Sequence, residues 1–214
     1  MPRTSNTSET AIPRLVGIRQ VSDGWIKKYV LAYAMPDGST YEYESASRKS
    51  IDAYRAELEG NARGERPIAD AVCIVPQTPD GNLLLIREFR YPLNSWCIAF
   101  PAGLKEPGES LAACVDRELR EETGYALRAE ADCANAPALE PLPQAGYSST
   151  GLTDETVHVV FAQVERVSTA QPEPNEFIEP FLLAIEDVPR FLAENRTPIG
   201  TRAQLVLETF ARRR

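Results

Sequence analysis

Residues 103–125, GLKEPGESLAACVDRELREETGY, decide the fold of this chain. Ser110 is a residue type that caps helix N-termini, and helix-forming residues follow it as far as Glu122. Gly124 stands where helices commonly end in a left-handed residue. The stretch therefore predicts a short helix that begins after a Pro-Gly loop.

Two carboxylates border the apolar face of this predicted helix. At about 100° per residue, one ridge of the helix is apolar. It consists of Leu111, Val115 and Leu119. Glu118 and Glu122, four residues apart, form the ridge beside it. Both acids should therefore lie at the edge of the buried surface.

Arg117 stands among four acids. It can brace Glu121 at i,i+4 and also reach Glu109 in the preceding loop. Acidic helix faces usually only meet solvent. Here that interpretation fits poorly, because Glu118 and Glu122 adjoin the apolar ridge and like charges at i,i+4 destabilise a helix by about 0.2–0.5 kcal/mol. A cation should offset the repulsion, and oxygen ligands without a nearby His or Cys favour Mg²⁺ or Mn²⁺.

The composition limits the classes of protein to which this chain can belong. The chain has 214 residues, 43% hydrophobic and 25% charged, which is ordinary for a soluble globular protein with a sizeable core. Its net charge of -8 argues against a nucleic-acid polymer as partner. Met1 to Thr10 lack the apolar core of a signal peptide, and no stretch approaches the ~20 apolar residues of a membrane span. We expect a cytoplasmic protein with no membrane partner.

The cysteines and the single histidine offer no alternative chemistry. The four cysteines lack zinc-binding spacing, so reduced thiols are expected. His158 lies in a segment that reads as a strand, which favours a structural role. A Ser-His-Asp hydrolase is therefore disfavoured.

The helix and its loop resemble the signature of the Nudix hydrolases, G-x5-E-x7-R-E-U-x-E-E-x-G-U, where U is bulky and apolar. Only Tyr125 departs from it, as an aromatic in place of an aliphatic residue. The matching positions are Gly103, Glu109, Arg117, Glu118, Leu119, Glu121, Glu122 and Gly124. The resemblance implies an α/β/α sandwich with a mixed sheet and Mg²⁺-dependent hydrolysis of a nucleoside diphosphate derivative.

Residues 87–92 and 98–103 are similar to the ADP-ribose pyrophosphatase branch, which includes nucleoside diphosphate sugar hydrolases. In that branch the carbonyl of Ala102 would bind metal and Arg90 would reach the phosphates, a task that suits a guanidinium. From the residues alone, Arg90 is equally a surface charge. Many members carry an acid where this chain has Ala99, which leaves the number of metals open.

The resemblance also implies roles for the acids. The metal set is Ala102, Glu118, Glu121 and Glu122, with Glu121 acting on metal-coordinated water. Arg117 and Glu109 hold the constellation, and a Glu on a mobile loop activates the attacking water. Glu176 matches that position best, with Glu173 as competitor. The catalytic set is Glu109, Arg117, Glu121, Glu122 and Glu176.

The first 66 residues resemble the same branch more weakly. In its dimeric members this segment forms a small antiparallel β-sheet that is exchanged between subunits. Trp25 and Tyr43 would stack on the base and Arg48 would contact phosphate or ribose. The alternative is that both aromatics pack a sheet face. We therefore expect residues 1–66 to dimerise and bind the base, and residues 67–214 to form the Nudix domain.

The remaining pattern predicts the order of the elements. Residues 15–43 read as a β-meander, and residues 52–60 are either a helical turn or a loop. Residues 69–75 and 82–89 read as a hairpin. A strand over 157–164 and a last strand over 181–185 precede a final helix from about 201 to 211.

These features predict hydrolysis of ADP-ribose to AMP and ribose 5-phosphate. The alternatives are another nucleoside diphosphate sugar, such as GDP-mannose, and a ligand-binding module of Nudix type without turnover. The complete set of carboxylates argues against the last, because a pure binder does not need it. Pro141 and Thr150 compete for a position that marks some ADP-ribose hydrolases, so the marker stays open.

Overall fold

The computed structural model describes residues 11–133 and 136–212. The expectation for Met1 to Thr10 lies outside the described residues. The chain forms two compact units. The first comprises the residues up to Pro67 together with residues 147–155, and the second comprises residues 68–146 and 156–214. The sequence predicted a boundary near Pro67, and the segment 147–155 adds a distant stretch of chain to the first unit.

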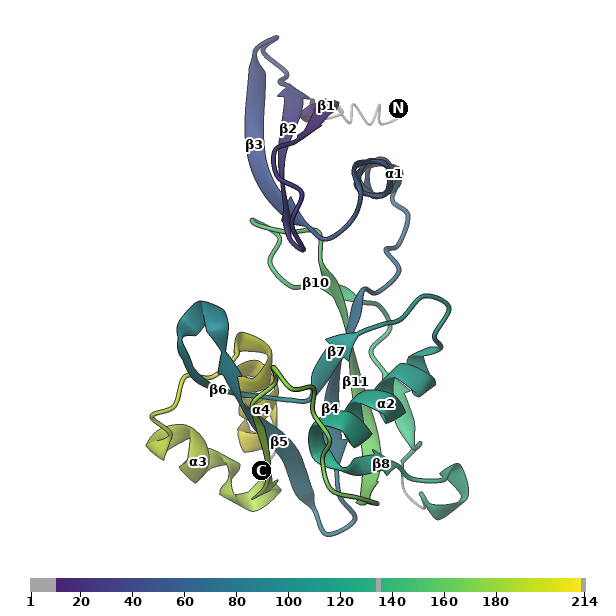
Figure 1. Ribbon diagram of the computed structural model, residues 1–214, viewed down its shortest axis with the longest axis vertical. Helices are drawn as coiled ribbons and strands as arrows, with labels where there is room; N and C mark the ends of the chain where they lie inside the picture. The colour runs from purple at the N-terminus through teal and green to yellow at the C-terminus, as the bar shows by residue number, and fades with distance from the viewer. Residues whose placement is uncertain (1–10, 134–135, 213–214) are drawn as a thin grey trace, which may run out of the picture. The chain divides into compact units, whose positions relative to one another are not determined.

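The first unit contains a three-stranded antiparallel sheet (Figure 1). Its strands follow the chain order: β1 (Arg14–Gln20), β2 (Lys27–Ala34) and β3 (Thr40–Ser47). The turn between β2 and β3 is closed by Asp37, whose Oδ1 accepts hydrogen bonds from the backbone N–H and hydroxyl of Ser39 at 2.9 and 2.6 Å. Gly38 takes the left-handed conformation that this turn requires. The predicted meander is confirmed.

A helix, α1 (Ile51–Ala62), packs against this sheet. It settles the alternative left open for residues 52–60. Ser50 caps it by accepting a hydrogen bond from the N–H of Ala53. The small core joins sheet and helix through Tyr29 and Tyr54, whose rings meet edge to face at 5.1 Å.

Residues 147–155 are tied to β3 by polar contacts. The backbone N–H of Ala46 donates to the carbonyl of Leu152 at 2.9 Å. Asp154 is buried and accepts hydrogen bonds from Ser47 at 3.0 Å and from the Lys49 ammonium at 2.9 Å. A buried carboxylate must be paired in this way, so these contacts fix the segment in the first unit.

The second unit is built on a mixed sheet. Its central order is β11 (Thr156–Arg166), β4 (Ala71–Gln77), β5 (Asn82–Arg90) and β12 (Ile178–Ala184). β11 and β4 run parallel, whereas β5 is antiparallel to β4 and β12, so the predicted hairpin is confirmed. Short strands extend the sheet: β6 (Ser95–Ala99) on β5, β7 (Ala102–Leu104) on β4, and β8 (Tyr125–Leu127) and β9 (Leu139–Pro141) on β11. β10 (Gly146–Tyr147) lies where the chain passes from the second unit into the first.

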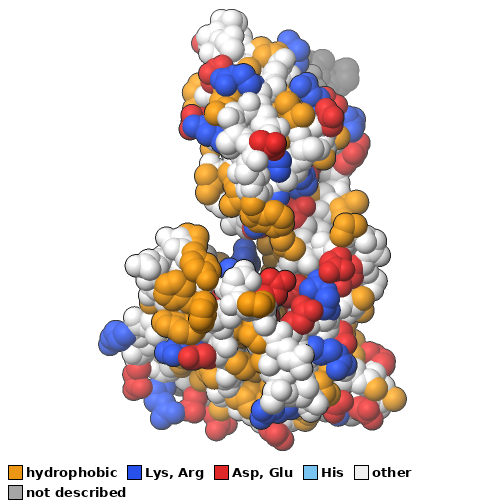
Figure 2. Space-filling view, viewed as in Figure 1, with side chains coloured by type: hydrophobic (Ala, Val, Ile, Leu, Met, Phe, Trp, Pro, Cys, Tyr) orange, Lys and Arg blue, Asp and Glu red, His pale blue; other side chains and the backbone are white. Residues whose placement is uncertain are grey.

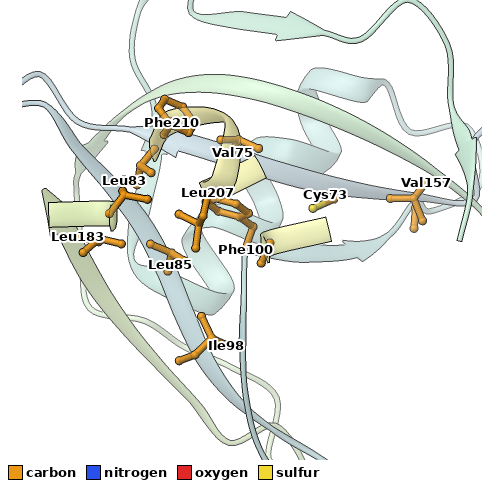
Figure 3. Packing of buried hydrophobic residues seen from close by; sticks show 13 residues of the cluster. Cys73, Val75, Leu83, Leu85, Ile98, Phe100, Val157, Leu183, Leu207 and Phe210 are labelled. Carbon is orange, nitrogen blue, oxygen red and sulfur yellow. The ribbon is translucent and has the colours of Figure 1, made fainter. Parts of the chain in front are cut away.

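Helices cover both faces of this sheet. α2 (Leu111–Thr123) packs on one face in a core with Val72, Ile74 and Leu84. α3 (Val188–Glu194) and α4 (Thr201–Arg212) pack on the other, and Figure 3 shows Leu207 and Phe210 among the side chains of β4 and β5. Single turns of 3-10 helix connect elements: η1 (Tyr91–Leu93), η2 (Glu130–Asp132) and η3 (Ile185–Asp187). The predicted α/β/α sandwich is confirmed.

The cysteines and the single histidine, His158, lie in surroundings typical of structural residues. All four cysteines are free, and three of them are buried. Nε2 of His158, in β11, lies 2.8 Å from the carbonyl oxygen of Leu142. Within residues 11–133 and 136–212, no helix has both the length and the apolar character needed to cross a membrane.

Candidate active site

The ends of α2 are those that the sequence predicted. The hydroxyl of Ser110 accepts a hydrogen bond from the N–H of Ala113 at 3.2 Å. Gly124 ends the helix at φ 76°, and its N–H donates to the carbonyl of Arg120. Leu119 is fully buried in the core, which fixes the rotation of the helix about its axis.

That rotation buries two carboxylates. Glu118 is only 8% exposed and Glu122 only 5%. Oε2 of Glu122 accepts a hydrogen bond from the backbone N–H of Ala102 at 3.1 Å. The backbone of β7 also passes so close to Glu118 that a Cβ on Gly103 would lie 1.9 Å from Oε1. A side chain at position 103 would therefore displace the carboxylate of Glu118 from this place.

Arg117 links the loop, the helix and β7. It donates two hydrogen bonds to Glu109, at 2.9 and 3.1 Å, and one to Glu121 at 3.2 Å, which are the contacts that the spacing predicted. It also donates to Glu118 at 2.7 Å and to the carbonyl of Leu104 at 3.0 Å, which the sequence did not predict. One guanidinium therefore braces three acids. In Figure 2, acidic side chains gather in the region of α2 and the loop before it.

The electrostatics of these acids differ. The hydrogen bonds from Arg117 lower the pKa of Glu109 to about 2. Burial raises the pKa of Glu118, although Arg117 opposes the shift. Burial, followed by the charges of Glu118 and Glu88, raises the pKa of Glu122 well above its ordinary value. Burial and mutual repulsion therefore disfavour the ionised forms of Glu118 and Glu122, and a bound cation would relieve both effects.

Glu176 lies near this interior. It is on the loop between β11 and β12, and its charge raises the pKa of Glu118 and of Glu122. Its competitor Glu173 is on the same loop, and the N–H of Glu173 donates to Oε2 of Glu176 at 3.0 Å. Of the two, Glu176 is the one whose charge acts on both buried acids of α2.

Arg90 ends β5 and is half-exposed. Its Nη1 lies 3.0 Å from Oε1 of Glu88, whose side chain is only 14% exposed. Sequence reasoning missed Glu88. The alternation of side chains along β5 could have identified it. Leu84 and Glu88 are an even number of residues apart, so both side chains face the α2 side of the sheet.

The predicted base-binding residues lie in the first unit. Trp25 stands just before β2 and is 72% exposed, so it does not pack a sheet face. Tyr43 lies in β3, and its hydroxyl donates to the carbonyl of Gly151 at 2.7 Å. Arg48 pairs with Glu155. The predicted acids, Arg117 and Arg90 therefore lie in the second unit. Trp25, Tyr43 and Arg48 lie in the first. Of the competing marker residues, Pro141 lies in β9 of the second unit and Thr150 in the first.

The acids of the second unit fit a hard divalent cation. Across the described part of the chain, no three His, Cys, Asp or Glu side chains stand ready as a complete metal site. However, the buried donors are carboxylate oxygens alone, their pKa values are raised by burial, and β7 brings backbone polar groups against them. Mg²⁺ needs only one or two carboxylates, because it keeps several waters and binds substrate phosphates.

Comparison with known proteins defines the class. The model of the NUDIX domain matches residues 67–202. The chain is 31% identical to the ADP-sugar pyrophosphatase of Mus musculus over 179 residues, which cover 78% of this chain and 72% of that protein. It is 34% identical to the ADP-ribose pyrophosphatase of Bacillus subtilis (strain 168) over 157 residues, covering 70% and 79%. This chain belongs to the Nudix hydrolase family, whose members generally use a divalent metal.

A solved structure, titled as the crystal structure of ADP compounds hydrolase, shares the fold. It aligns with a TM-score of 0.69 at 21% identity, covering 94% of this chain and 92% of that one. The likeness therefore includes the small antiparallel sheet as well as the larger mixed sheet.

Proposed function

We propose that this protein hydrolyses the diphosphate linkage of ADP-ribose, giving AMP and ribose 5-phosphate, with Mg²⁺ as cofactor. Mn²⁺ is the expected substitute. The observation that carries the proposal is the pair of buried carboxylates, Glu118 and Glu122, held beside the backbone of β7. The names of the relatives from Mus musculus and Bacillus subtilis support the choice of an ADP-sugar.

The residues divide the work. Glu118, Glu122 and the carbonyl of Ala102 would hold Mg²⁺, which would neutralise the diphosphate and lower the pKa of a bound water. Glu121 is half-exposed and orients water beside them. Arg117 keeps Glu118 in place, because it ties that acid to Glu109.

Two groups act on the substrate itself. Arg90 binds the diphosphate, a task for which a planar guanidinium is suited. Glu176 orients the attacking water and accepts its proton, a role supported by its place beside Glu118 and Glu122, on both of which its charge acts. On the first unit, Trp25 and Tyr43 stack on the base and Arg48 contacts phosphate or ribose.

A homodimer that exchanges its N-terminal strands is part of the proposal. It is supported by apolar side chains exposed on the first unit, among them Val16, Trp25 and Tyr41. Light scattering after size exclusion tests it, and a monomeric mass at micromolar concentration would refute it.

Substrate choice is tested by incubation with ADP-ribose, GDP-mannose, UDP-glucose and NADH, each with Mg²⁺ and with Mn²⁺. Chromatography should show AMP mainly from ADP-ribose. Faster hydrolysis of GDP-mannose would shift the assignment to that sugar nucleotide. Binding of a substrate without hydrolysis by any metal-loaded sample would mean a binding module.

Matched variants connect the activity to the site. Glu122→Gln should abolish hydrolysis and leave the fold intact by circular dichroism. Glu208→Gln, on the far helix α4, should retain wild-type activity. Full activity in Glu122→Gln would overturn the assignment of the metal ligands.

A further inference from the structure

A partly buried acid that the Nudix signature does not contain, Glu88, stands at the edge of the site. Leu83 and Leu85 of β5 belong to the core under α4, whereas Leu84 belongs to the core under α2. Side chains alternate along a strand, so Glu88 points to the same side as Leu84. That is the side on which α2 presents Glu118 and Glu122.

The neighbouring strands place Glu88 more closely. It pairs with Cys97 of β6, the strand that leads into β7 and its Ala102. On the other side it pairs with Ile178 of β12, two residues after Glu176. Glu88 therefore stands between the chain segment that supplies the metal-binding carbonyl and the loop that supplies Glu176. The charges agree, because Glu88 acts on the pKa of Glu122 and Glu176 acts on that of Glu88.

The position of Ala99 explains why an acid at position 88 is useful. Ala99 pairs with Ile86, two residues along the ladder from the Glu88 and Cys97 pair, so Ala99 and Glu88 are diagonal neighbours on one face. The resemblance to the ADP-ribose pyrophosphatase branch implies an acid at position 99 in many of its members, whereas this chain carries a methyl group there. Glu88 therefore presents its carboxylate on the same face of the sheet as an acid at position 99 would.

We propose that Glu88 is a further acidic residue of the Nudix site, strengthening divalent-cation binding from β5 in place of an acid at position 99. The proposal rests on the proposed function only in its need for a divalent cation, not in the identity of the sugar nucleotide. Glu88 also positions Arg90, since the two side chains are paired at 3.0 Å. One acid thereby connects the cation to the guanidinium that binds phosphate.

The test measures Mn²⁺ binding to the substrate-free protein by isothermal titration and by electron paramagnetic resonance. Glu88→Gln keeps the size of the side chain and should weaken Mn²⁺ binding by about 10-fold, as changes around a metal site do. The double variant Glu88→Gln with Ala99→Glu should recover to within about 3-fold of wild type, by the same scale. Glu179→Gln, an exposed acid on β12 paired with Arg87, is the matched control and should bind as wild type does.

Each other outcome is decisive. Wild-type Mn²⁺ affinity in Glu88→Gln would overturn the role in cation binding, and a raised KM in that same variant would reduce Glu88 to a brace for Arg90. A double variant as weak as Glu88→Gln would overturn the exchange between positions 88 and 99. Failure of the wild-type protein itself to bind Mn²⁺ or Mg²⁺ would overturn the metal in the proposed function together with this inference.

Discussion

Gly103 and Glu118 are in closer contact than any other residue at position 103 would allow. A Cβ on Gly103 would lie 1.9 Å from Oε1 of Glu118 and 2.0 Å from its Cδ. The backbone of β7 therefore forms one wall of the site, and Glu118 lies against it. Arg117 donates a hydrogen bond to the same oxygen at 2.7 Å.

Gly103→Ala should reduce kcat by about 100-fold, because a displacement of about 1 Å at a catalytic group costs that much. The clash involves the end of a flexible side chain, so the fold should survive while Glu118 moves away from Arg117. Steady-state kinetics and a thermal melt check this. Gly146→Ala is the control, since a Cβ there meets nothing within 4 Å. Equal activity in both variants would show that Glu118 need not lie against β7.

Arg117→Ala should destabilise the protein by about 2 kcal/mol or more, because it leaves Glu118 buried without its cation. Arg120 offers a control on the same helix. Its pair with Asp116 is largely exposed, so Arg120→Ala should cost less than about 1 kcal/mol. Urea denaturation of the two variants gives the comparison, and similar losses would contradict a special role for Arg117.

The helix of the site was predictable because its signals are local. Ser110, the apolar ridge and Gly124 each act within a few residues, so the ends of α2 and the burial of Glu118 and Glu122 followed from spacing alone. The contacts of Arg117 with Glu109 and Glu121 followed in the same way. The strong motif also made the sandwich predictable as the fold of a family.

What the sequence did not reveal depends on strand register and on distant chain segments. The place of Glu88 follows from its pairing with Cys97 and Ile178, and register is set by the whole sheet. The membership of residues 147–155 in the first unit rests on contacts such as that of Asp154 with Lys49, about a hundred positions apart. No local pattern carries such information. The ambiguous stretch 52–60 became a helix because Tyr54 is buried against the sheet.

The loop that carries Glu176 is anchored to the end of β5. The hydroxyl of Tyr91 donates a hydrogen bond to the carbonyl oxygen of Asn175 at 3.0 Å. The backbone N–H of Phe89 donates to the carbonyl oxygen of Phe177, also at 3.0 Å. Tyr91→Phe removes one anchor worth about 1 kcal/mol. Hydrogen exchange in residues 173–177 should rise about 5-fold and kcat should fall by a similar factor. Tyr147→Phe, which loses a hydroxyl bond to Asn61 in the first unit, should leave this loop unchanged.

Glu122→Gln should stabilise the metal-free protein at about pH 8. Burial raises the pKa of Glu122 in the folded state, so its contribution to stability is complete below the ordinary pKa and is lost as the pH rises through the raised one. Glutamine stays neutral and avoids this loss. In EDTA the variant should melt roughly 2–4 °C above wild type, for a gain of about 1 kcal/mol, and the gap should close towards about pH 4. Mg²⁺ should raise the melting temperature of wild type alone. Equal melting at about pH 8 would show that the carboxylate is already compensated without metal.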